Sequence, residues 1–310
     1  MTTATMADRD GLIWLDGEMV PWRDARVHVL THTLHYGMGV FEGTRAYRTD
    51  RGPCIFRLVD HTERLFRSAH IMNMKIPYTQ QQLNAAQLEL IRVNDLPEAY
   101  IRPMAFYGAE GMGLRADNLK VHVMIAAWVW SSYMSPEALV NGIKVRTSSY
   151  TRNHVNIAMC KAKANGNYIN SMLALQEALG SGADEALLLD SEGYVSEGSG
   201  ENFFMVSRGV LYTPELTSCL DGITRRTVCT LAEEEGLKIV EKRITRDEVY
   251  VADEAFFTGT AAEVTPIQSL DGRIIGSGTR GPITTRLQQL YFDEVAARRD
   301  GHPGWHSFVN

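Results

Sequence analysis

The sequence predicts an α+β fold in two domains, and three observations carry this prediction. The chain has 310 residues, which is longer than one compact domain usually is and too short for three. Its predicted strands and helices are mixed without regular strand–helix–strand alternation, which argues against a doubly wound parallel sheet. A polar stretch containing Pro136 ends a long apolar run. We therefore predict a small N-terminal domain at 1–130, a linker at 131–139 and a large C-terminal domain at 140–310.

Local signals predict the elements of the first domain. Asp16-Gly17 separates two short apolar runs and predicts a two-residue hairpin turn. Asp60 and Thr79 are each followed three positions later by Glu or Gln, a spacing typical of a capping box at a helix start. The predicted helices cover 61–74 and 79–94, and the predicted strands cover 99–107 and 121–130.

The second domain is predicted in the same way. Gly180 should stop a helix that begins near Tyr168, and Thr224 resembles the N-cap of a helix that runs to Gly236. Pro136, which lies within the linker, suits the first turn of a short helix. Strands are predicted at 143–149 and across 185–212.

Composition excludes several classes of protein. Hydrophobic residues make up 45% and charged residues 22%, as in ordinary globular chains. A net charge of -6 with interspersed signs provides no basic stripe, so we expect no nucleic-acid partner. The four cysteines show no C-x-x-C spacing, which favours free thiols in a reducing compartment. The longest apolar run, 123–130, is too short to span a bilayer, and 1–10 has no apolar core of a signal peptide, so we expect no membrane partner and a cytoplasmic location.

Several short motifs carry the chemistry when they are read together. They are His35–Gly37 with Val40–Gly43, Lys163–Tyr168, Ser196–Asn202, Gly222–Thr224 and Thr258–Glu263. In this order they resemble the fold-type IV pyridoxal-phosphate enzymes, and most closely the bacterial branched-chain aminotransferases. The resemblance runs from Trp14 to about Gln289, and an ordered set is far more specific than any one motif. It implies a D-amino acid aminotransferase-like fold with pyridoxal 5'-phosphate in the cleft between the domains, and it makes the large C-terminal domain at 140–310 the cofactor-binding domain.

Two nearby lysines, Lys161 and Lys163, could each carry that cofactor. Either is more often a solvated surface residue when it stands alone. The family places the catalytic lysine five residues before the tyrosine of Gly-Asn-Tyr, and counting back from Tyr168 gives Lys163. The resemblance therefore assigns Lys163 as the catalytic residue and leaves Lys161 as a bystander.

The resemblance also implies the other cofactor-binding residues. Glu197 matches the acid that pairs with the pyridine nitrogen, while Glu201 is interpreted as structural. Arg57 matches the arginine that grips the phosphate, for which a planar guanidinium is well suited. Tyr168 matches the residue that hydrogen-bonds the phenolic oxygen. The remaining expected cofactor contacts are Leu220, Ile223, Thr224 and Thr260, of which Ile223 and Thr224 lie at a presumed helix start that favours an anion.

A substrate pocket is implied by the same resemblance. Tyr100 and Arg102 stand two residues apart on a predicted strand and so share one face. In the family the tyrosine helps to hold the α-carboxylate and the arginine meets the side-chain carboxylate of glutamate. The other expected lining positions are Tyr36, Phe41, Gly43, Met112, Leu114, Trp130, Tyr133, Gly200, Thr260 and Ala261. Tyr36 and the Met112 loop are expected from a second subunit, which implies a homodimer or a higher homo-oligomer.

The implied reaction is transamination of L-leucine, L-isoleucine and L-valine with 2-oxoglutarate, so the partners are amino acids and 2-oxo acids. Alternatives on the same fold are transamination of D-amino acids or (R)-amines, and an aminodeoxychorismate-type lyase reaction. An alternative from another class is a nicotinamide-dependent oxidoreductase, or a non-catalytic small-molecule binder, built on the Gly-rich segment 276–281. We interpret that segment as a turn into the last helix, because only 29 residues follow it. His28, His32 and His35 have a metal-like spacing but no acidic or Cys companion, so no metal is expected.

Overall fold

The computed structural model describes residues 5–130 and 135–309, and the chain divides into two compact units. Unit 1 comprises Met1–Ser131, Ala162–Gly166 and Val295–Asn310. Unit 2 comprises Ser132–Lys161 and Asn167–Glu294. The bounds differ from the predicted domain ranges, which grouped 162–166 and 295–310 with the second domain.

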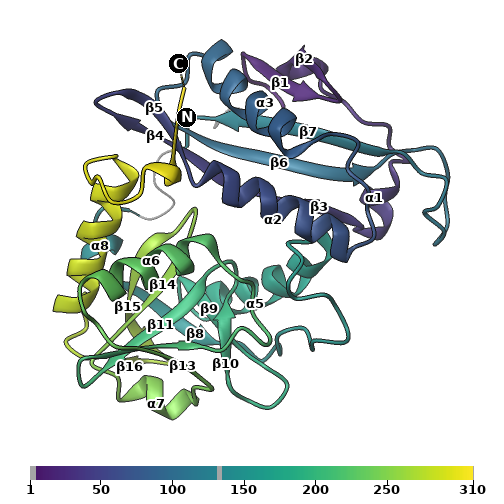
Figure 1. Ribbon diagram of the computed structural model, residues 1–310. Coiled ribbons are helices and arrows are strands. Elements are labelled where there is room, and N and C mark those ends of the chain that lie inside the picture. Colours follow the sequence, from purple (N-terminus) through teal and green to yellow (C-terminus); the bar gives the residue numbers. More distant parts are fainter. Residues whose placement is uncertain (1–4, 131–134, 310) are drawn as a thin grey trace. The chain divides into compact units, whose positions relative to one another are not determined.

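Unit 1 is built on an antiparallel sheet in the order β17-β5-β4-β6-β7-β1-β2, with β3 paired to β6. Helices α2 and α3 lie side by side against this sheet (Figure 1). The strands are β1 (Leu12–Leu15), β2 (Glu18–Pro21), β3 (Gly39–Phe41), β4 (Thr44–Thr49), β5 (Gly52–Phe56), β6 (Ala99–Tyr107), β7 (Val121–Trp128) and β17 (His306–Phe308). The helices are α1 (His32–Tyr36), α2 (Leu58–Ile71) and α3 (Gln80–Val93), with short 3-10 turns η1 (Trp22–Asp24) and η3 (Pro303–Trp305).

The local predictions for unit 1 are confirmed at the hairpin and at α3. Asp16 and Gly17 have φ of 49° and 101°, as a two-residue turn between β1 and β2 requires. Thr79 and Gln82 form the predicted capping box of α3. The two predicted strands correspond to β6 and β7.

The prediction for the start of α2 was wrong. The helix begins at Leu58 rather than near 61, and its N-cap is Arg57 in a left-handed conformation. Asp60 does not cap the helix, because both of its carboxylate oxygens accept hydrogen bonds from the Arg57 guanidinium at 2.7 Å. A capping-box pattern alone cannot show that an arginine competes for the acid.

Unit 2 contains a mixed sheet in the order β10-β9-β8-β15-β14-β11-β12-β13, with β16 beside β15. Three of its pairings, β8–β9, β8–β15 and β12–β13, are parallel. The strands are β8 (Ile143–Thr147), β9 (Glu185–Leu189), β10 (Val195–Gly198), β11 (Asn202–Ser207), β12 (Val210–Pro214), β13 (Ile239–Lys242), β14 (Glu254–Gly259), β15 (Glu263–Leu270) and β16 (Arg273–Ile274). The helices are α4 (Ala138–Asn141), α5 (Tyr168–Gly180), α6 (Ile223–Glu234), α7 (Arg246–Tyr250) and α8 (Pro282–Val295). The 3-10 turn η2 (Asn165–Asn167) lies directly before α5, and its first two residues belong to unit 1.

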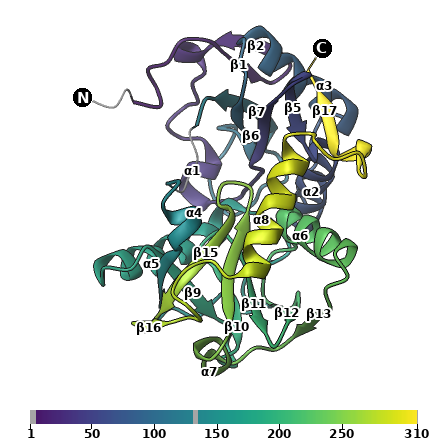
Figure 2. The ribbon, with the colours of Figure 1, turned by 90° about the vertical axis from the view of Figure 1, so that its left-hand side faces the viewer.

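Helices α6 and α8 run beside one another in unit 2, where Arg286 and Glu235 form an ion pair at 2.8 Å (Figure 2). The predicted helix at 168–179 corresponds to α5. Thr224 is not an N-cap as predicted: α6 begins at Ile223 and its N-cap is Gly222, two residues before Thr224. A Cβ at Gly222 would lie 1.9 Å from Asn202 Oδ1, so a larger residue there would have to displace the Asn202 side chain. Part of the predicted linker, 131–134, lies outside the described residues.

Two distant segments are joined to unit 1 by backbone pairing. Val40 forms an antiparallel bridge with Ala164, and β17 pairs with β5 in the register His306↔Phe56. Such pairings depend on partners far away in the sequence, which local patterns do not reveal. They explain why unit 1 takes residues from three parts of the chain.

The cysteines behave as small buried groups. Cys54, Cys160 and Cys219 are buried free thiols, and burial raises the pKa of Cys54 to about 11 and that of Cys219 to about 12. Within 5–130 and 135–309, no helix is long and apolar enough to cross a membrane.

Candidate active site

Lys163 is held by its backbone in unit 1. Its carbonyl accepts the Phe41 N–H at 3.1 Å, and its own N–H donates to Ser68 Oγ on α2 at 3.0 Å. The Nζ atom lies 5.0 Å from the centroid of the Phe41 ring. The lysine is therefore fixed between β3 and α2, with its amine beside an aromatic face.

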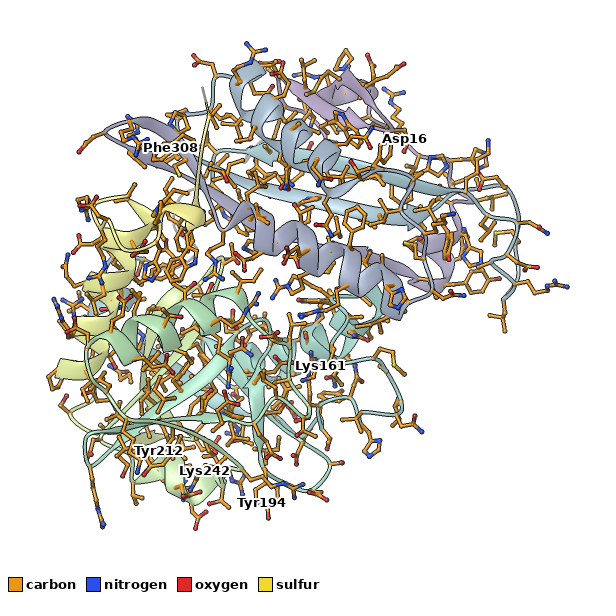
Figure 3. The ribbon with its side chains drawn as sticks, viewed as in Figure 1. Asp16, Lys161, Tyr194, Tyr212, Lys242 and Phe308 are labelled. Carbon is orange, nitrogen blue, oxygen red and sulfur yellow. The ribbon has the colours of Figure 1, made fainter. Side chains whose placement is uncertain are left out.

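Lys161 has a different environment in unit 2 (Figure 3). Its amine donates to the carbonyls of Leu216 and of Cys219, the latter at 2.9 Å. The Lys161 amine therefore has a structural role, because it satisfies two loop carbonyls. This role agrees with the interpretation of Lys161 as a bystander.

A polar and aromatic cluster surrounds Phe41 in unit 1. Arg102 Nη2 donates to Tyr100 Oη at 3.1 Å, and the Arg102 guanidinium lies 4.7 Å from the centroid of the Phe41 ring. Trp130 packs edge-on against Tyr100 at 4.8 Å. A Cβ at Gly43 would lie only 2.0 Å from Tyr100 Oη, so glycine is needed for this close approach. The structure thus brings together five of the predicted lining residues, namely Phe41, Gly43, Tyr100, Arg102 and Trp130.

The loop that carries Met112 and Leu114 is fastened to α1. His32 Nε2 lies 2.7 Å from the carbonyl of Gly113, and the Gly113 N–H donates to Tyr36 Oη at 3.2 Å. Met112 and Leu114 themselves are 50% and 89% exposed. The single chain therefore presents these apolar side chains outward from a fastened loop. Tyr133 lies outside the described residues.

Glu197 is the central acid of unit 2. It lies on β10, is buried, and accepts the Leu220 N–H at Oε2 with a distance of 3.0 Å. Arg152 Nη2 lies 2.8 Å from Oε1, yet Oε1 accepts no hydrogen bond of good geometry among the described residues. Glu201, the neighbouring acid, accepts the N–H of Gly200 in its own turn at 2.9 Å.

Arg152 is a residue that the sequence prediction missed. It is buried, and Nη1 donates to Asn170 Oδ1 at 3.1 Å and Ser171 Oγ at 3.2 Å on α5. Burial opposes its charge, but the Glu197 carboxylate outweighs burial and raises the pKa of Arg152. Nothing in the local sequence around Arg152 marks this pairing, because its partners lie on α5 and β10.

The start of α6 offers an anion site in unit 2. Ile223 and Thr224 occupy its first turn and are buried, and Gly222 supplies no side-chain cap, so backbone N–H groups remain for a ligand. The buried hydroxyl of Thr258 on β14 has no hydrogen-bond partner within the described part of the chain. An unpartnered buried hydroxyl needs a reason, and a ligand is one.

Thr260 and Ala261 lie in the turn between β14 and β15. A Cβ at Gly259 would lie 3.5 Å from the carbonyl of Gly200, so this turn and the Gly200 turn are neighbours. Both turns carry residues predicted to bind substrate.

Comparison with known proteins gives the family. The sequence pattern of the family described as Amino-transferase class IV matches residues 39–270. The branched-chain-amino-acid aminotransferase of Pseudomonas aeruginosa is 68% identical over 305 residues, which cover 98% of this chain and 99% of that protein. The chain belongs to the branched-chain-amino-acid aminotransferases of class IV. The predicted family, fold and enzyme class are confirmed.

Solved structures agree with this class IV assignment. A T.th. branched-chain amino acid aminotransferase with pyridoxamine 5'-phosphate matches with a TM-score of 0.95 and 48% identity, covering 97% of this chain and 99% of that one. The T.th. enzyme complexed with N-(5'-phosphopyridoxyl)-L-glutamate matches with a TM-score of 0.93 and 47% identity, with the same coverage. Pyridoxal phosphate is therefore the cofactor of this aminotransferase.

The residues present fit that cofactor. Glu197 offers a buried carboxylate for a ring N–H, and the uncapped start of α6 with the unpartnered Thr258 hydroxyl suits a phosphate. The Lys163 amine beside Phe41 suits a covalent anchor. Each unit by itself thus presents groups of the expected chemistry.

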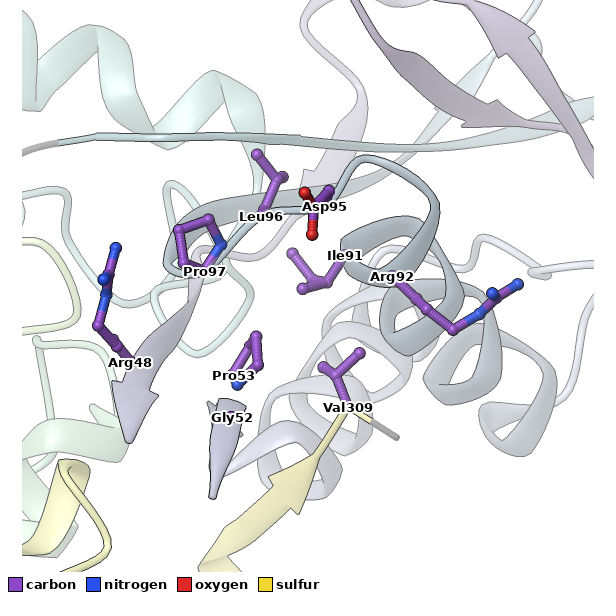
Figure 4. Close-up of a pocket in the computed structure, with 9 residues that line it drawn as sticks. All are labelled: Arg48, Gly52, Pro53, Ile91, Arg92, Asp95, Leu96, Pro97 and Val309. Atoms are coloured by element: carbon purple, nitrogen blue, oxygen red, sulfur yellow. The ribbon is translucent and has the colours of Figure 1, made fainter. Parts of the chain in front are cut away.

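Other features of this aminotransferase lie apart from the predicted site residues. A cavity of about 320 Å³ in unit 1 is lined by Arg48, Gly52, Pro53, Ile91, Arg92, Asp95, Leu96, Pro97 and Val309, none of them a predicted site residue (Figure 4). The Gly-rich segment 276–281 is the predicted turn into α8. The backbone N–H groups of Ile283 and Thr284 at that helix start donate to the Glu254 carboxylate at 3.0 and 2.7 Å, so an internal acid occupies the place of a dinucleotide phosphate.

Proposed function

We propose that the chain transfers the amino group of L-leucine, L-isoleucine and L-valine to 2-oxoglutarate, giving branched-chain 2-oxo acids and L-glutamate. The observation that carries this proposal is the Arg102–Tyr100 pair packed on Phe41, beside the Lys163 amine. Aromatic surface can bind an aliphatic side chain, while a guanidinium can pair with the side-chain carboxylate of glutamate. The glutamate adduct of the T.th. enzyme supports glutamate as the second substrate.

The proposed cofactor contacts follow the family motifs and the geometry of each unit. Lys163 carries the cofactor, Glu197 holds a proton on the pyridine nitrogen, and Tyr168 donates to the phenolic oxygen. When bound, pyridoxal phosphate supplies an electron sink for the carbanion at the substrate Cα. The phosphate is held by Arg57, Ile223, Thr224 and Thr260, and Leu220 orients Glu197 through its backbone N–H.

The substrate contacts complete the proposal. Tyr100 with the backbone N–H groups of Thr260 and Ala261 holds the α-carboxylate, and the Gly200 turn adjoins them. The freed amine of Lys163 removes the Cα proton as a general base, which requires the fixed position that Phe41 and Ser68 give its backbone. The Lys163 amine then donates that proton to C4′ of the cofactor.

Assembly as a homodimer is part of the proposal. Tyr36, Met112 and Leu114 are 43%, 50% and 89% exposed in the single chain, and a second copy would bury these apolar groups. Assembly beyond the dimer and the cytoplasmic location stay predictions from the sequence.

The direct test is a half-reaction. Holoenzyme is mixed with L-leucine, L-glutamate, D-alanine or an (R)-amine, and the visible absorption of the bound cofactor is followed. L-leucine and L-glutamate should remove the absorption, and D-alanine and the (R)-amine should not. Loss of absorption with D-alanine alone would favour the D-amino acid alternative and refute the proposal.

Arg102 allows a sharper test of the dual specificity. Arg102→Leu removes the guanidinium and keeps bulk beside Phe41. We expect kcat/KM for L-glutamate to fall about 100-fold, because a charge-assisted bidentate contact is lost, and kcat/KM for L-leucine to fall less than about fivefold. Equal losses for both substrates would assign Arg102 to the architecture of the pocket and not to glutamate.

A further inference from the structure

We propose that Trp305 is a positioning residue for Arg57, which it holds in the plane that the cofactor phosphate requires. The inference rests on the proposed role of Arg57 as the phosphate-binding arginine. Trp305 is 248 positions away from Arg57 in the sequence (305 − 57), yet both belong to unit 1. No sequence motif links them.

The backbone of Arg57 is the first element of this arrangement. Arg57 follows β5 and has φ 55° and ψ 34°, a left-handed conformation that L-residues rarely adopt. Its N–H donates to the carbonyl of Trp305 at 2.7 Å. This bond holds the turn between β5 and α2, and so sets the direction in which the Arg57 side chain leaves the backbone.

The Arg57 guanidinium is held by Asp60 along one edge and by the Trp305 ring on one face. Its Nε and Nη2 atoms both donate to Asp60 at 2.7 Å, which fixes one edge. Its Cζ atom lies 4.4 Å from the centroid of the Trp305 ring, which covers a face. Arg57 is only 7% exposed. A guanidinium held in this way loses little freedom when it binds an anion.

The Trp305 ring is itself held in place. Phe56 packs edge-on against it at 5.9 Å and 90°, and His302 stacks on it at 3.7 Å and 6°. The strand β17 that follows directly pairs with β5, with His306 opposite Phe56. The ring is therefore a fixed platform under Arg57 and not a loosely placed surface side chain.

The arrangement predicts that loss of the Trp305 ring weakens binding of the cofactor phosphate and leaves binding of the rest of the cofactor unchanged. Trp305→Leu removes the aromatic face and keeps an apolar side chain. The dissociation constant for pyridoxal phosphate should rise about tenfold, which is the order expected for a partly buried cation–π contact. The dissociation constant for pyridoxal, which lacks the phosphate, should change less than about twofold.

The experiment measures both dissociation constants on the full chain after the cofactor is removed. Trp305→Phe, which keeps a ring under Arg57, should stay within about threefold of the parent for both ligands. Arg57→Gln tests the underlying role and should raise the dissociation constant for pyridoxal phosphate about 100-fold while leaving pyridoxal unchanged. Thermal unfolding of each variant shows whether the fold is retained.

The outcomes separate the role of Arg57 in binding the phosphate from the role of Trp305 in positioning Arg57. If Arg57→Gln binds pyridoxal phosphate normally, the proposed role of Arg57 fails. If Arg57→Gln loses the phosphate preference but Trp305→Leu keeps it, or if Trp305→Leu weakens both ligands equally, the positioning role of Trp305 is overturned. If Trp305→Leu does not fold, His302→Ala is the deciding variant, because it removes the ring that stacks on Trp305. It should raise the dissociation constant for pyridoxal phosphate, but not that for pyridoxal, by about two- to threefold. An unchanged dissociation constant for pyridoxal phosphate would overturn the inference.

Discussion

Each unit contains a buried pair of a glutamate and an arginine, and the two pairs are satisfied to different degrees. In unit 1, Glu42 is fully buried and accepts hydrogen bonds from Arg64 Nε at 2.6 Å, Arg64 Nη2 at 2.9 Å and His61 Nδ1 at 2.7 Å. In unit 2, Glu197 has one backbone bond and an ion pair with Arg152, but its Oε1 accepts no well-formed hydrogen bond, and Arg152 Nε has no partner in the described chain.

The difference in hydrogen bonding indicates which of the two glutamates is structural and which can bind a ligand. The Glu42 oxygens already accept three hydrogen bonds from side chains of α2, so Glu42 acts within the fold by holding β3 to α2. A buried carboxylate with an incompletely used oxygen retains the capacity to accept one more N–H. That capacity is what an acid facing a cofactor nitrogen needs, so the comparison supports the proposed role of Glu197 and gives Glu42 a structural one.

The largest expected effect is on activity at Glu197. Glu197→Gln keeps the size of the side chain but cannot hold a proton on the pyridine nitrogen. We expect kcat/KM for L-leucine to fall on the order of 10³-fold, since a fixed charge at the reacting group is lost. Urea unfolding should show a smaller loss of stability than for Glu42→Gln, because Arg152 keeps its bonds to Asn170 and Ser171 when the carboxylate is removed. A large loss of stability with normal activity would reverse the assignment.

Glu42→Gln should show the opposite pattern. It leaves the buried Arg64 without its carboxylate, and breaking a buried ion pair in this way costs about 3 kcal/mol or more. The double variant Glu42→Gln/Arg64→Met is the matched control and should recover much of the loss, because no buried charge is then left alone. Activity per folded molecule should stay within about tenfold of the parent. The comparison fails if Glu42→Gln abolishes activity in protein that remains fully folded.

The smallest expected effect is a pH dependence of unit 1. Burial lowers the pKa of His61 despite its bond to Glu42, and Arg64 with His61 overcomes burial to hold the pKa of Glu42 well below its usual range. Below the ordinary pKa of 6.5 the unfolded chain therefore binds a proton that folded His61 does not, and below 4.5 the same holds for Glu42. Stability should fall on acidification, by about 1.4 kcal/mol per pH unit for each such proton.

His61→Gln isolates the first part of this dependence. Between about pH 6.5 and 5 the free energy of unfolding of the variant should fall less steeply than that of the parent, by up to the slope of one proton. Urea unfolding at several pH values measures both curves. Parallel curves would show that His61 has the same proton affinity in the folded and unfolded chains.

Local signals in the sequence were sufficient where the stabilising partner is a near neighbour. Asp16-Gly17 and the Thr79–Gln82 box specify a turn and a helix start through contacts within a few residues, and both are found. The choice of Lys163 over Lys161 came from the family resemblance and stays a prediction, and the Lys161 amine donates to two loop carbonyls.

The contacts that the sequence did not predict are those between residues far apart in the chain. Arg152 meets Glu197 across 45 positions (197 − 152), and Ala164 bridges Val40. Asp60 looked like a helix cap because the pattern shows the acid and its spacing but not the arginine that captures it. Motifs thus pointed to the residues proposed to meet the cofactor, and the structure was needed to find the residues that hold them.

The assignment of Lys163 is tested most directly by chemical trapping. Holoenzyme is treated with borohydride, digested, and analysed by mass spectrometry for the peptide that retains the phosphopyridoxyl group. The account predicts the label on Lys163, with Lys161 unmodified and with no label in Lys163→Ala. Labelling of Lys161, or a fully active and labelled Lys163→Ala variant, would contradict it.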